Sequence, residues 1–209
     1  VIRLKIGDEI SLFNNKSGEW KCEIVDIKNN FLKAKAISQI SSPRSEALID
    51  LMFSPIKYQN SEAIIRQATE MGVRSLFPTT FKRTINKKIN LDKFNAYALG
   101  ATQQSGRLSI PKIDKLNDLK SRSDILSDKT VLMFDENLEG IHLSQAKIKS
   151  NDEILVIIGP EGGFEEEERA FISNASKNFL NVSLGHNILK ADTAVIAALS
   201  LTFHYFNEN

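Results

Sequence analysis

The chain has 209 residues, of which 42% are hydrophobic and 25% charged, as in a globular protein with one large domain or two small ones. Its longest strongly apolar stretch, residues 194–201, is far shorter than the roughly 20 residues that span a bilayer, so no membrane segment is expected. The net charge of +1 excludes a uniformly basic protein. The single cysteine, Cys22, excludes an internal disulfide, and we therefore expect a reducing, cytoplasmic setting.

Alternating apolar and polar residues predict antiparallel strands in residues 1–45. The apolar positions are Ile2, Leu4 and Ile6, then Trp20, Cys22 and Ile24, then Leu32, Ala34 and Ala36. We interpret this region as a small β-barrel with Trp20 in its core and basic residues such as Arg3 and Lys5 outside. Because the chain begins inside a strand pattern, we also expect an N-terminal strand to be missing.

A polar stretch at residues 38–45 is the expected linker, and strands alternate with helices after it. Strands are predicted at residues 48–53, 73–77, 131–134, 154–158 and 180–184. Helices are predicted at residues 61–71, where Gly72 ends the helix, at residues 91–101 and at residues 193–206. This alternation predicts that residues 46–209 form an α/β domain with a mostly parallel sheet covered on both faces.

Two glycine-containing loops follow apolar segments in the last quarter of the chain. The first is residues 158–164 (Ile-Gly-Pro-Glu-Gly-Gly-Phe), and the second is residues 184–194, which lead into the last predicted helix. Such loops let backbone N–H and C=O groups approach a ligand in α/β proteins. We therefore expect the two loops to form one composite pocket.

Neither loop has the pattern of a dinucleotide-binding or phosphate-binding loop. The first loop also runs into four consecutive glutamates, residues 165–168, which would repel a phosphate. A nucleoside without phosphates, carrying a positive charge, fits better, and S-adenosylmethionine is such a ligand. The alternative is that the glycines only make tight turns and that the glutamates only form a solvated helix end.

The charges are divided between the two parts of the chain. Residues 1–125 contain 21 basic and 13 acidic side chains, a net charge of +8, whereas residues 126–209 contain 6 and 13, a net charge of −7. A basic first part is typical of a polyanion-binding surface, which would bind nucleic acid in a salt-dependent manner. A chance segregation of charge is the alternative.

Four segments, in this order, resemble one family. They are residues 68–73 with Arg83 downstream, residues 103–107 followed by Ile110 and Pro111, residues 158–164 with Glu168, and residues 184–194. Together they are similar to the RsmE family, the small-subunit ribosomal RNA uridine-N3 methyltransferases of the SPOUT superfamily. The resemblance implies a trefoil-knotted α/β domain after a PUA-like RNA-binding barrel, a homodimer, and 16S ribosomal RNA or the small ribosomal subunit as partner.

The resemblance also implies where ligands bind. S-adenosylmethionine would be held by backbone of both loops and by the strand end at Phe134, and no metal is implied. The implied cofactor-binding residues are Phe134, Ile158, Gly159, Pro160, Glu161, Gly162, Gly163, Leu184, Gly185, Ile188, Leu189, Thr193 and Ala194. The implied RNA-binding residues are Arg3, Lys5, Lys82, Arg83 and Lys190.

Methylation of uracil N3 requires that this nitrogen lose its proton near the transition state. A cationic group near O2 or O4 would stabilise the developing uracil anion. Arg107 is the candidate for that role, with Gln104 orienting the base or the cofactor. A phosphate contact that only positions RNA is the alternative for Arg107. The sequence singles out no general base, so water and a carboxylate both remain open.

The last loop departs from the family pattern G-x-R-x-L-R-x-E-T, because Asn187, Lys190 and Asp192 stand where Arg, Arg and Glu are expected. Lysine does not reproduce the bidentate grip of arginine. Two other functions therefore remain open. One is a related methyltransferase that acts on transfer RNA or on ribose, and the other is a non-catalytic RNA-binding derivative of the fold.

Overall fold

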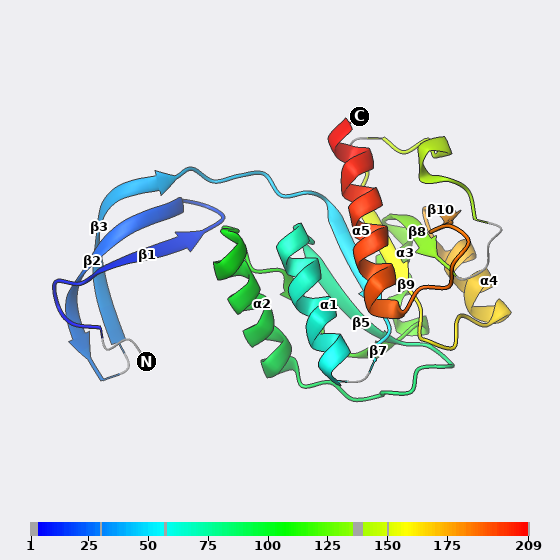
Figure 1. Ribbon diagram of the computed structural model, residues 1–209, viewed down its shortest axis with the longest axis horizontal. Helices are drawn as coiled ribbons and strands as arrows, with labels where there is room; N and C mark the ends of the chain where they lie inside the picture. Colours follow the sequence, from blue (N-terminus) through cyan, green and yellow to red (C-terminus); the bar gives the residue numbers. More distant parts are fainter. Residues whose placement is uncertain (1–3, 30, 57, 136–139, 150, 209) are drawn as a thin grey trace. The chain divides into compact units, whose positions relative to one another are not determined.

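The computed structural model describes residues 4–29, 31–56, 58–135, 140–149 and 151–208, and the chain divides into two compact units (Figure 1). The first unit consists of Val1–Glu46 and Gly106–Ser109, and the second of Ala47–Ser105 and Ile110–Asn209. Each unit has its own β-sheet. Among the described residues, no helix is both long and apolar enough to cross a membrane.

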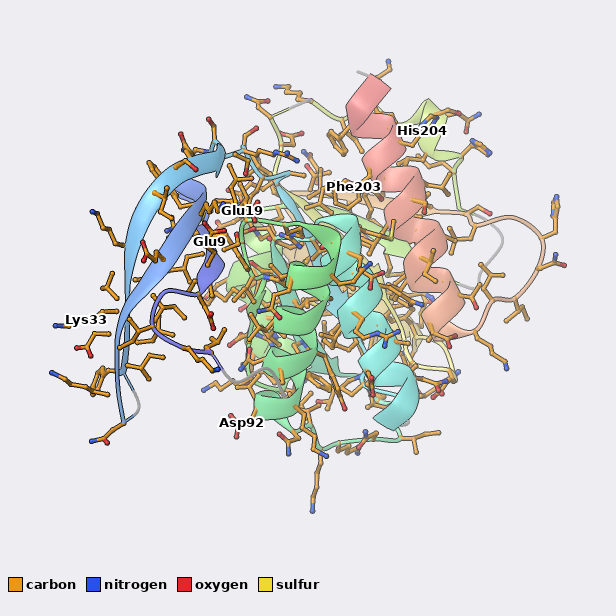
Figure 2. All side chains as sticks on the ribbon, turned by 60° about the vertical axis from the view of Figure 1, so that its left-hand side comes forward. Glu9, Glu19, Lys33, Asp92, Phe203 and His204 are labelled. Atoms are coloured by element: carbon orange, nitrogen blue, oxygen red, sulfur yellow. The ribbon has the colours of Figure 1, made fainter. Side chains whose placement is uncertain are left out.

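The first unit contains a three-stranded antiparallel sheet in the order β1-β2-β3. Its strands are β1 (Glu9–Asn14), β2 (Gly18–Lys28) and β3 (Phe31–Ser41). Cys22 and Ile24 on β2 are buried, and the Lys33 side chain extends from β3 into solvent (Figure 2). The antiparallel strands predicted around Trp20–Ile24 and Leu32–Ala36 are confirmed, but the described residues form an open sheet rather than a closed barrel, and Trp20 is only partly buried.

The strand predicted at the start of the chain is wrong for its described part, Leu4 to Ile6. The backbone N–H of Lys5 donates to the Asp8 carboxylate at 2.7 Å, and the N–H of Asp8 donates to the Lys5 carbonyl at 3.1 Å. Gly7 has a φ of 92°, which suits a turn. Because these bonds close a turn at residues 5–8, the β1–β2 ladder begins only at Glu9.

The second unit contains a parallel sheet in the order β10-β8-β9-β4-β5-β6, with β7 also paired to β5. The strands are β4 (Ile49–Phe53), β5 (Ser75–Thr80), β6 (Lys112–Ile113), β7 (Asn117–Asp118), β8 (Thr130–Phe134), β9 (Ile154–Ile158) and β10 (Asn178–Val182). This arrangement confirms the predicted α/β fold with a parallel sheet. The predicted strands at 73–77 and 180–184 are displaced by about two residues, since β5 begins at Ser75, after Val73 has closed the end of α1, and β10 already ends at Val182.

Helices cover both faces of this sheet. They are α1 (Tyr58–Met71), α2 (Leu91–Ser105), α3 (Ser123–Ser127), α4 (Glu166–Ala175) and α5 (Ala191–Glu208), with short 3-10 turns at Lys120–Arg122 and Leu143–Gln145. Figure 1 shows α1, α2 and α5 side by side on one face. Leu132 and Phe134 pack towards these three helices, whereas Val131 and Met133 pack towards α3 and α4. Since strand residues alternate between faces, an uninterrupted apolar run such as β8 serves both cores.

Gly72 ends α1 as predicted. It has a φ of 103°, and the N–H of Val73 donates to the Ala68 carbonyl at 3.0 Å. Phe203 on α5, visible in Figure 2, would lie 3.5 Å from a Cβ at Gly72. Glycine is therefore favoured here by backbone conformation, and the neighbouring aromatic ring fills the space beside it.

The central strands of the second unit end in register. Val182, Phe134, Ile158 and Phe53 are successive cross-strand partners at the carboxyl ends of β10, β8, β9 and β4, and Phe53 pairs with Pro78, two residues before the end of β5. The loops that follow these strands consequently leave from one edge of the sheet. In α/β proteins, ligands bind at this edge.

An ion network holds the opposite edge of the sheet. Arg74 and Lys129 each contact both Asp50 and Glu153, at distances between 2.6 and 2.9 Å. The Asp50 side chain is 1% exposed, so its charge needs these partners. Hydrogen bonds from Arg74 and Lys129 lower the pKa of Glu153 to about 2.

The lowered pKa of Glu153 predicts acid-dependent stability. Because the pKa is below the ordinary value of 4.5, the stabilisation is complete above about pH 4.5 and is lost as the pH falls to about 2. Replacing Glu153 with Gln should cost about 1 kcal/mol at pH 7, since the carboxylate is partly solvated. We expect the melting temperature to fall by about 2–4 °C at pH 7 and to match that of the unchanged chain near pH 2.

Glu70→Gln is the matched control, because Glu70 is an exposed carboxylate on α1 outside the network. Its thermal melts should follow those of the unchanged chain at both pH values. A Glu153→Gln deficit of equal size at pH 7 and pH 2 would show that the ion network does not cause it.

Candidate functional site

A pocket opens at the carboxyl edge of the parallel sheet, where β8, β9 and β10 end. It encloses about 630 Å³ of space, the solvent at its open mouth included. Its lining comes from three segments, the end of β8, the loop after β9 and the segment between β10 and α5. The lining residues are Phe134, Asp135, Ile158, Gly159, Pro160, Glu161, Gly163, Phe164, Leu184, Gly185, Asn187, Ile188, Leu189, Ala191 and Ala194.

The loop after β9 is folded back on its own aromatic residue. A Cβ at Gly159 would lie 2.7 Å from the Phe164 ring, so only glycine allows this approach. The N–H of Gly163, whose φ is 72°, donates to the Pro160 carbonyl at 2.8 Å. The Phe164 ring packs edge-on against Phe81 with 5.2 Å between centroids. The loop is therefore a tight turn around a buried phenylalanine.

The loop between β10 and α5 is more open. Gly185 has a φ of 99°, and its N–H donates to the Ser183 hydroxyl at 3.1 Å. Ile188 is 78% exposed although it lines the pocket. α5 begins at Ala191, directly after this loop. The loop thus presents backbone groups and one exposed apolar side chain to the pocket.

The third wall is the end of β8. Asp135 follows Phe134, and its carboxylate accepts hydrogen bonds from Arg169 Nε at 2.5 Å and Arg169 Nη2 at 3.3 Å. The Asp135 side chain is completely buried, so Arg169 compensates its charge. This ion pair ties the end of β8 to α4.

The charges of the pocket decide which ligands fit. No lysine or arginine is among its described lining residues, whereas Asp135 and Glu161 are. A phosphate would find no cationic side chain there. The adenosine, sulfonium and amino-acid parts of S-adenosylmethionine fit a wall of backbone and apolar groups with carboxylates nearby.

Of the thirteen residues predicted to bind the cofactor, eleven line this one pocket, and the exceptions are Gly162 and Thr193. Gly162 is covered from outside by Arg83, and Thr193 is exposed on α5. The lining also includes four residues that the sequence reasoning missed, which are Asp135, Phe164, Asn187 and Ala191. Asp135, Phe164 and Asn187 are direct chain neighbours of predicted residues, and Ala191 lies two residues after Leu189 inside the second predicted loop, so widening each predicted segment by two residues would have found them.

The run of glutamates has a structural role. Glu165 caps α4, and the Glu168 carboxylate accepts from the Glu165 N–H at 3.0 Å and from the Lys82 N–H at 2.8 Å. Glu168 is 7% exposed. The run is thus not merely a solvated face, because Glu168 is buried. Its carboxylate joins α4, and with it the loop at residues 158–164 (below, the glycine loop), to the segment after β5.

Neither predicted catalytic residue is among the pocket-lining residues. Gln104 is exposed on α2. Arg107 belongs to the first unit, where its Nη2 lies 3.5 Å from the Glu46 carboxylate and 3.2 Å from the Ser109 hydroxyl. Burial lowers the pKa of Arg107, and Glu46 partly opposes this shift. Arg107 is consequently held in place rather than extended freely into solvent.

The residues predicted to bind RNA fall into two groups. Lys5 and Lys190 are exposed, and Arg3 lies outside the described residues. Lys82 and Arg83 are engaged by α4, since Lys82 Nζ lies 2.6 Å from Glu167 and 3.4 Å from Glu165, and Arg83 Nε lies 3.4 Å from Glu165. Glu167 and then Glu165 raise the pKa of Lys82, and Lys82 lowers the pKa of Glu167.

Two protein-family models match the chain. Residues 43–202 match an RNA methyltransferase domain, and residues 1–37 match an RNA methyltransferase PUA domain. The chain is 32% identical to ribosomal RNA small subunit methyltransferase E of Rickettsia conorii over 204 residues, which cover 96% of this chain and 82% of that protein. It is 31% identical to ribosomal RNA small subunit methyltransferase E 2 of Borreliella burgdorferi over 210 residues, which cover 96% and 84%.

Solved structures share the fold. A Legionella pneumophila protein described as a putative methyltransferase, in complex with the bound cofactor SAM, has a TM-score of 0.79 and 25% identity, covering 96% of this chain and 85% of that chain. Ribosomal RNA small subunit methyltransferase E of Neisseria gonorrhoeae, bound to S-adenosyl methionine, has a TM-score of 0.84 and 22% identity, covering 97% and 85%. The expected fold class is confirmed by these likenesses.

The approach of Gly159 to Phe164 predicts an intolerance of side chains. Alanine at position 159 should destabilise the chain by about 1–3 kcal/mol, because the buried Phe164 ring is held by Phe81 and cannot swing aside. Thermal unfolding measures this loss. Gly100→Ala is the control, because a Cβ at Gly100 on α2 meets no atom within 4 Å and alanine favours a helix. Equal melting temperatures for the two variants would contradict the prediction.

Proposed function

This chain belongs to the RNA methyltransferase family, and from that premise we propose that it methylates N3 of a uridine in 16S ribosomal RNA, with S-adenosylmethionine as the methyl donor. The observation that carries the proposal is the pocket made by two glycine-containing loops and a strand end, with the Glu161 carboxylate but no lysine or arginine among its described lining residues. Such a lining suits a cationic nucleoside.

The names of the relatives support ribosomal RNA of the small subunit as the substrate. The Rickettsia conorii and Borreliella burgdorferi proteins are both ribosomal RNA small subunit methyltransferases, and each is matched over more than four-fifths of its length. The family model for a PUA domain of RNA methyltransferases matches residues 1–37. We therefore assign an RNA-binding role to the first unit, with Lys5 as one of its contacts, and a further contact to Lys190 beside the pocket.

The reaction requires orientation more than activation. S-adenosylmethionine, when bound, supplies a methyl group on a sulfonium that needs no further activation. The backbone of the loops at Gly159 and Gly185 would hold it so that the methyl group faces the base, because in-line alignment with the attacking nitrogen determines the rate. The walls at Phe134, Leu184 and Leu189 would exclude water from the adenosine.

Uracil must develop negative charge as its N3 proton leaves. Arg107 would stabilise that charge at O2 or O4, and Gln104 would orient the base. Glu46 and Ser109 hold the Arg107 guanidinium in place, which reduces the entropy lost when it binds the base. We further propose that the chain acts as a homodimer, with each pocket receiving RNA with help from the second subunit.

The direct test is the product. Purified protein should transfer labelled methyl groups from S-adenosylmethionine to small ribosomal subunits or 16S ribosomal RNA, and digestion followed by mass spectrometry should identify 3-methyluridine. Transfer RNA should accept none. Exclusive transfer to transfer RNA or to a ribose hydroxyl would replace the proposal with the related-methyltransferase alternative, and absence of cofactor binding would favour an RNA-binding module.

Arg107 gives a sharper test of the mechanism. Arg107→Met should lower kcat by about 10²–10³ at saturating RNA, since one preorganised donor to the developing anion is lost. Calorimetry should show unchanged affinity for S-adenosylmethionine. If Arg107 only binds a phosphate, kcat at saturating RNA will be unchanged, and the salt dependence of RNA binding will weaken instead. Thermal melts check that freeing Glu46 has not unfolded the chain.

A further inference from the structure

The turn that follows β5 is packed against the glycine loop. Phe81 N–H donates to the Thr84 hydroxyl at 2.8 Å, and the same hydroxyl lies 2.8 Å from that of Ser54. The N–H of Ser54 in turn donates to the carbonyl of Ile158 at 3.2 Å. The turn is therefore attached to the residue that directly precedes Gly159.

Three successive residues of this turn contact three parts of the glycine loop and its continuation. The Phe81 ring packs on Phe164. The Lys82 N–H binds the buried carboxylate of Glu168. The Arg83 guanidinium donates from Nη1 to the Gly162 carbonyl at 2.6 Å. The aliphatic part of Arg83 also covers Gly162, since a Cβ there would lie 3.2 Å from Arg83 Cβ and 3.3 Å from its Cδ.

The contact from Arg83 and one hydrogen bond within the loop hold the two polar ends of a single peptide group, the one between Gly162 and Gly163. The Gly162 carbonyl is held by Arg83, and the Gly163 N–H of the same peptide is held by the Pro160 carbonyl at 2.8 Å. A peptide between two glycines rotates easily, because glycine accepts positive and negative φ alike. Among the hydrogen bonds of the described residues, the one to Pro160 would be left to oppose that rotation without Arg83.

We infer that Arg83 is a positioning residue of the cofactor pocket, which holds the Gly162–Gly163 peptide in the orientation that S-adenosylmethionine requires. The inference rests on the proposed function, because it concerns the ligand of that same pocket. It differs from the sequence-based prediction that Arg83 binds RNA, since the guanidinium is directed to Gly162 and Glu165. Arg83 touches the loop, not the reacting atoms.

Lys82 provides a matched control on the neighbouring position. Its ammonium, like the Arg83 guanidinium, lies 3.4 Å from Glu165, and the two side chains are 51% and 50% exposed. The Lys82 side chain has its second contact with Glu167, whereas Arg83 has its second contact with Gly162. Replacing each with Met removes one cation near α4, but only Arg83→Met removes the contact to the glycine loop.

The experiment is calorimetric titration of S-adenosylmethionine into the full chain and its variants. Arg83→Met should weaken binding about tenfold, the size expected for loss of one charge-assisted hydrogen bond. Lys82→Met should bind as the unchanged chain does. Arg83→Lys keeps a cationic donor for the Gly162 carbonyl and should recover most of the affinity. In steady-state assays, Arg83→Met should raise KM for the cofactor and leave kcat at saturation nearly unchanged.

A second measurement needs no cofactor. Amide hydrogen exchange at residues 162–165 should be faster in Arg83→Met than in Lys82→Met, while exchange in β8 and β9 stays the same. If Arg83→Met is too unstable to titrate, Arg83→Leu, which also lacks a donor for the Gly162 carbonyl, takes its place in both measurements with the same expected losses.

The outcomes separate the two proposals. If the unchanged chain binds S-adenosylmethionine and Arg83→Met binds it equally well, the positioning role is wrong and the proposed function stands. The positioning role is also wrong if Arg83→Met and Lys82→Met both raise only the KM for RNA, which is the result of phosphate contacts. If the unchanged chain does not bind the cofactor, the proposed function fails and this inference fails with it.

Discussion

The parallel alignment of β10, β8 and β9 is the constraint on which the candidate site depends. Val182, Phe134 and Ile158 are partners across these strands, so three segments distant in sequence leave the sheet at one level. A slip of one residue in either pairing would turn the side chains of a whole strand to the opposite core. The two helical layers, each packed on one set of alternating strand residues, hold that register and with it the pocket.

The two edges of this sheet differ in how their charged side chains are paired. At the amino edge, Asp50 and Glu153 are matched by Arg74 and Lys129, so this network stabilises strand starts. At the carboxyl edge, the acidic start of α4 engages cations from the turn after β5, while the described pocket lining has no lysine or arginine. The pocket, with the Glu161 carboxylate in its lining, therefore lies beside basic side chains that are already paired with glutamates.

The glycine loop shows how backbone can form a specific site without catalytic side chains of its own. Its shape follows from packing of Gly159 on Phe164 and from contacts made by the turn after β5. Phe81 and Arg83, which are not among the pocket-lining residues, thus help to decide where its backbone groups lie. This is the physical basis of the inference that Arg83, although of a type that commonly contacts RNA, positions the pocket backbone instead.

The sequence by itself determined the α/β class and most strands and helices, because long apolar periodicities are local signals. Nearly all of the predicted pocket lining followed from the resemblance of the two loops to one family. It misplaced the first strand, since the Asp8 side chain closes a turn that competes with an alternating pattern. Only the tertiary structure decided the open three-stranded sheet, the burial of Glu168 and the partners of Lys82 and Arg83. The burial of Glu168 and the partners of Lys82 and Arg83 depend on contacts between residues about 80 positions apart, such as Arg83 and Gly162, which no local pattern encodes.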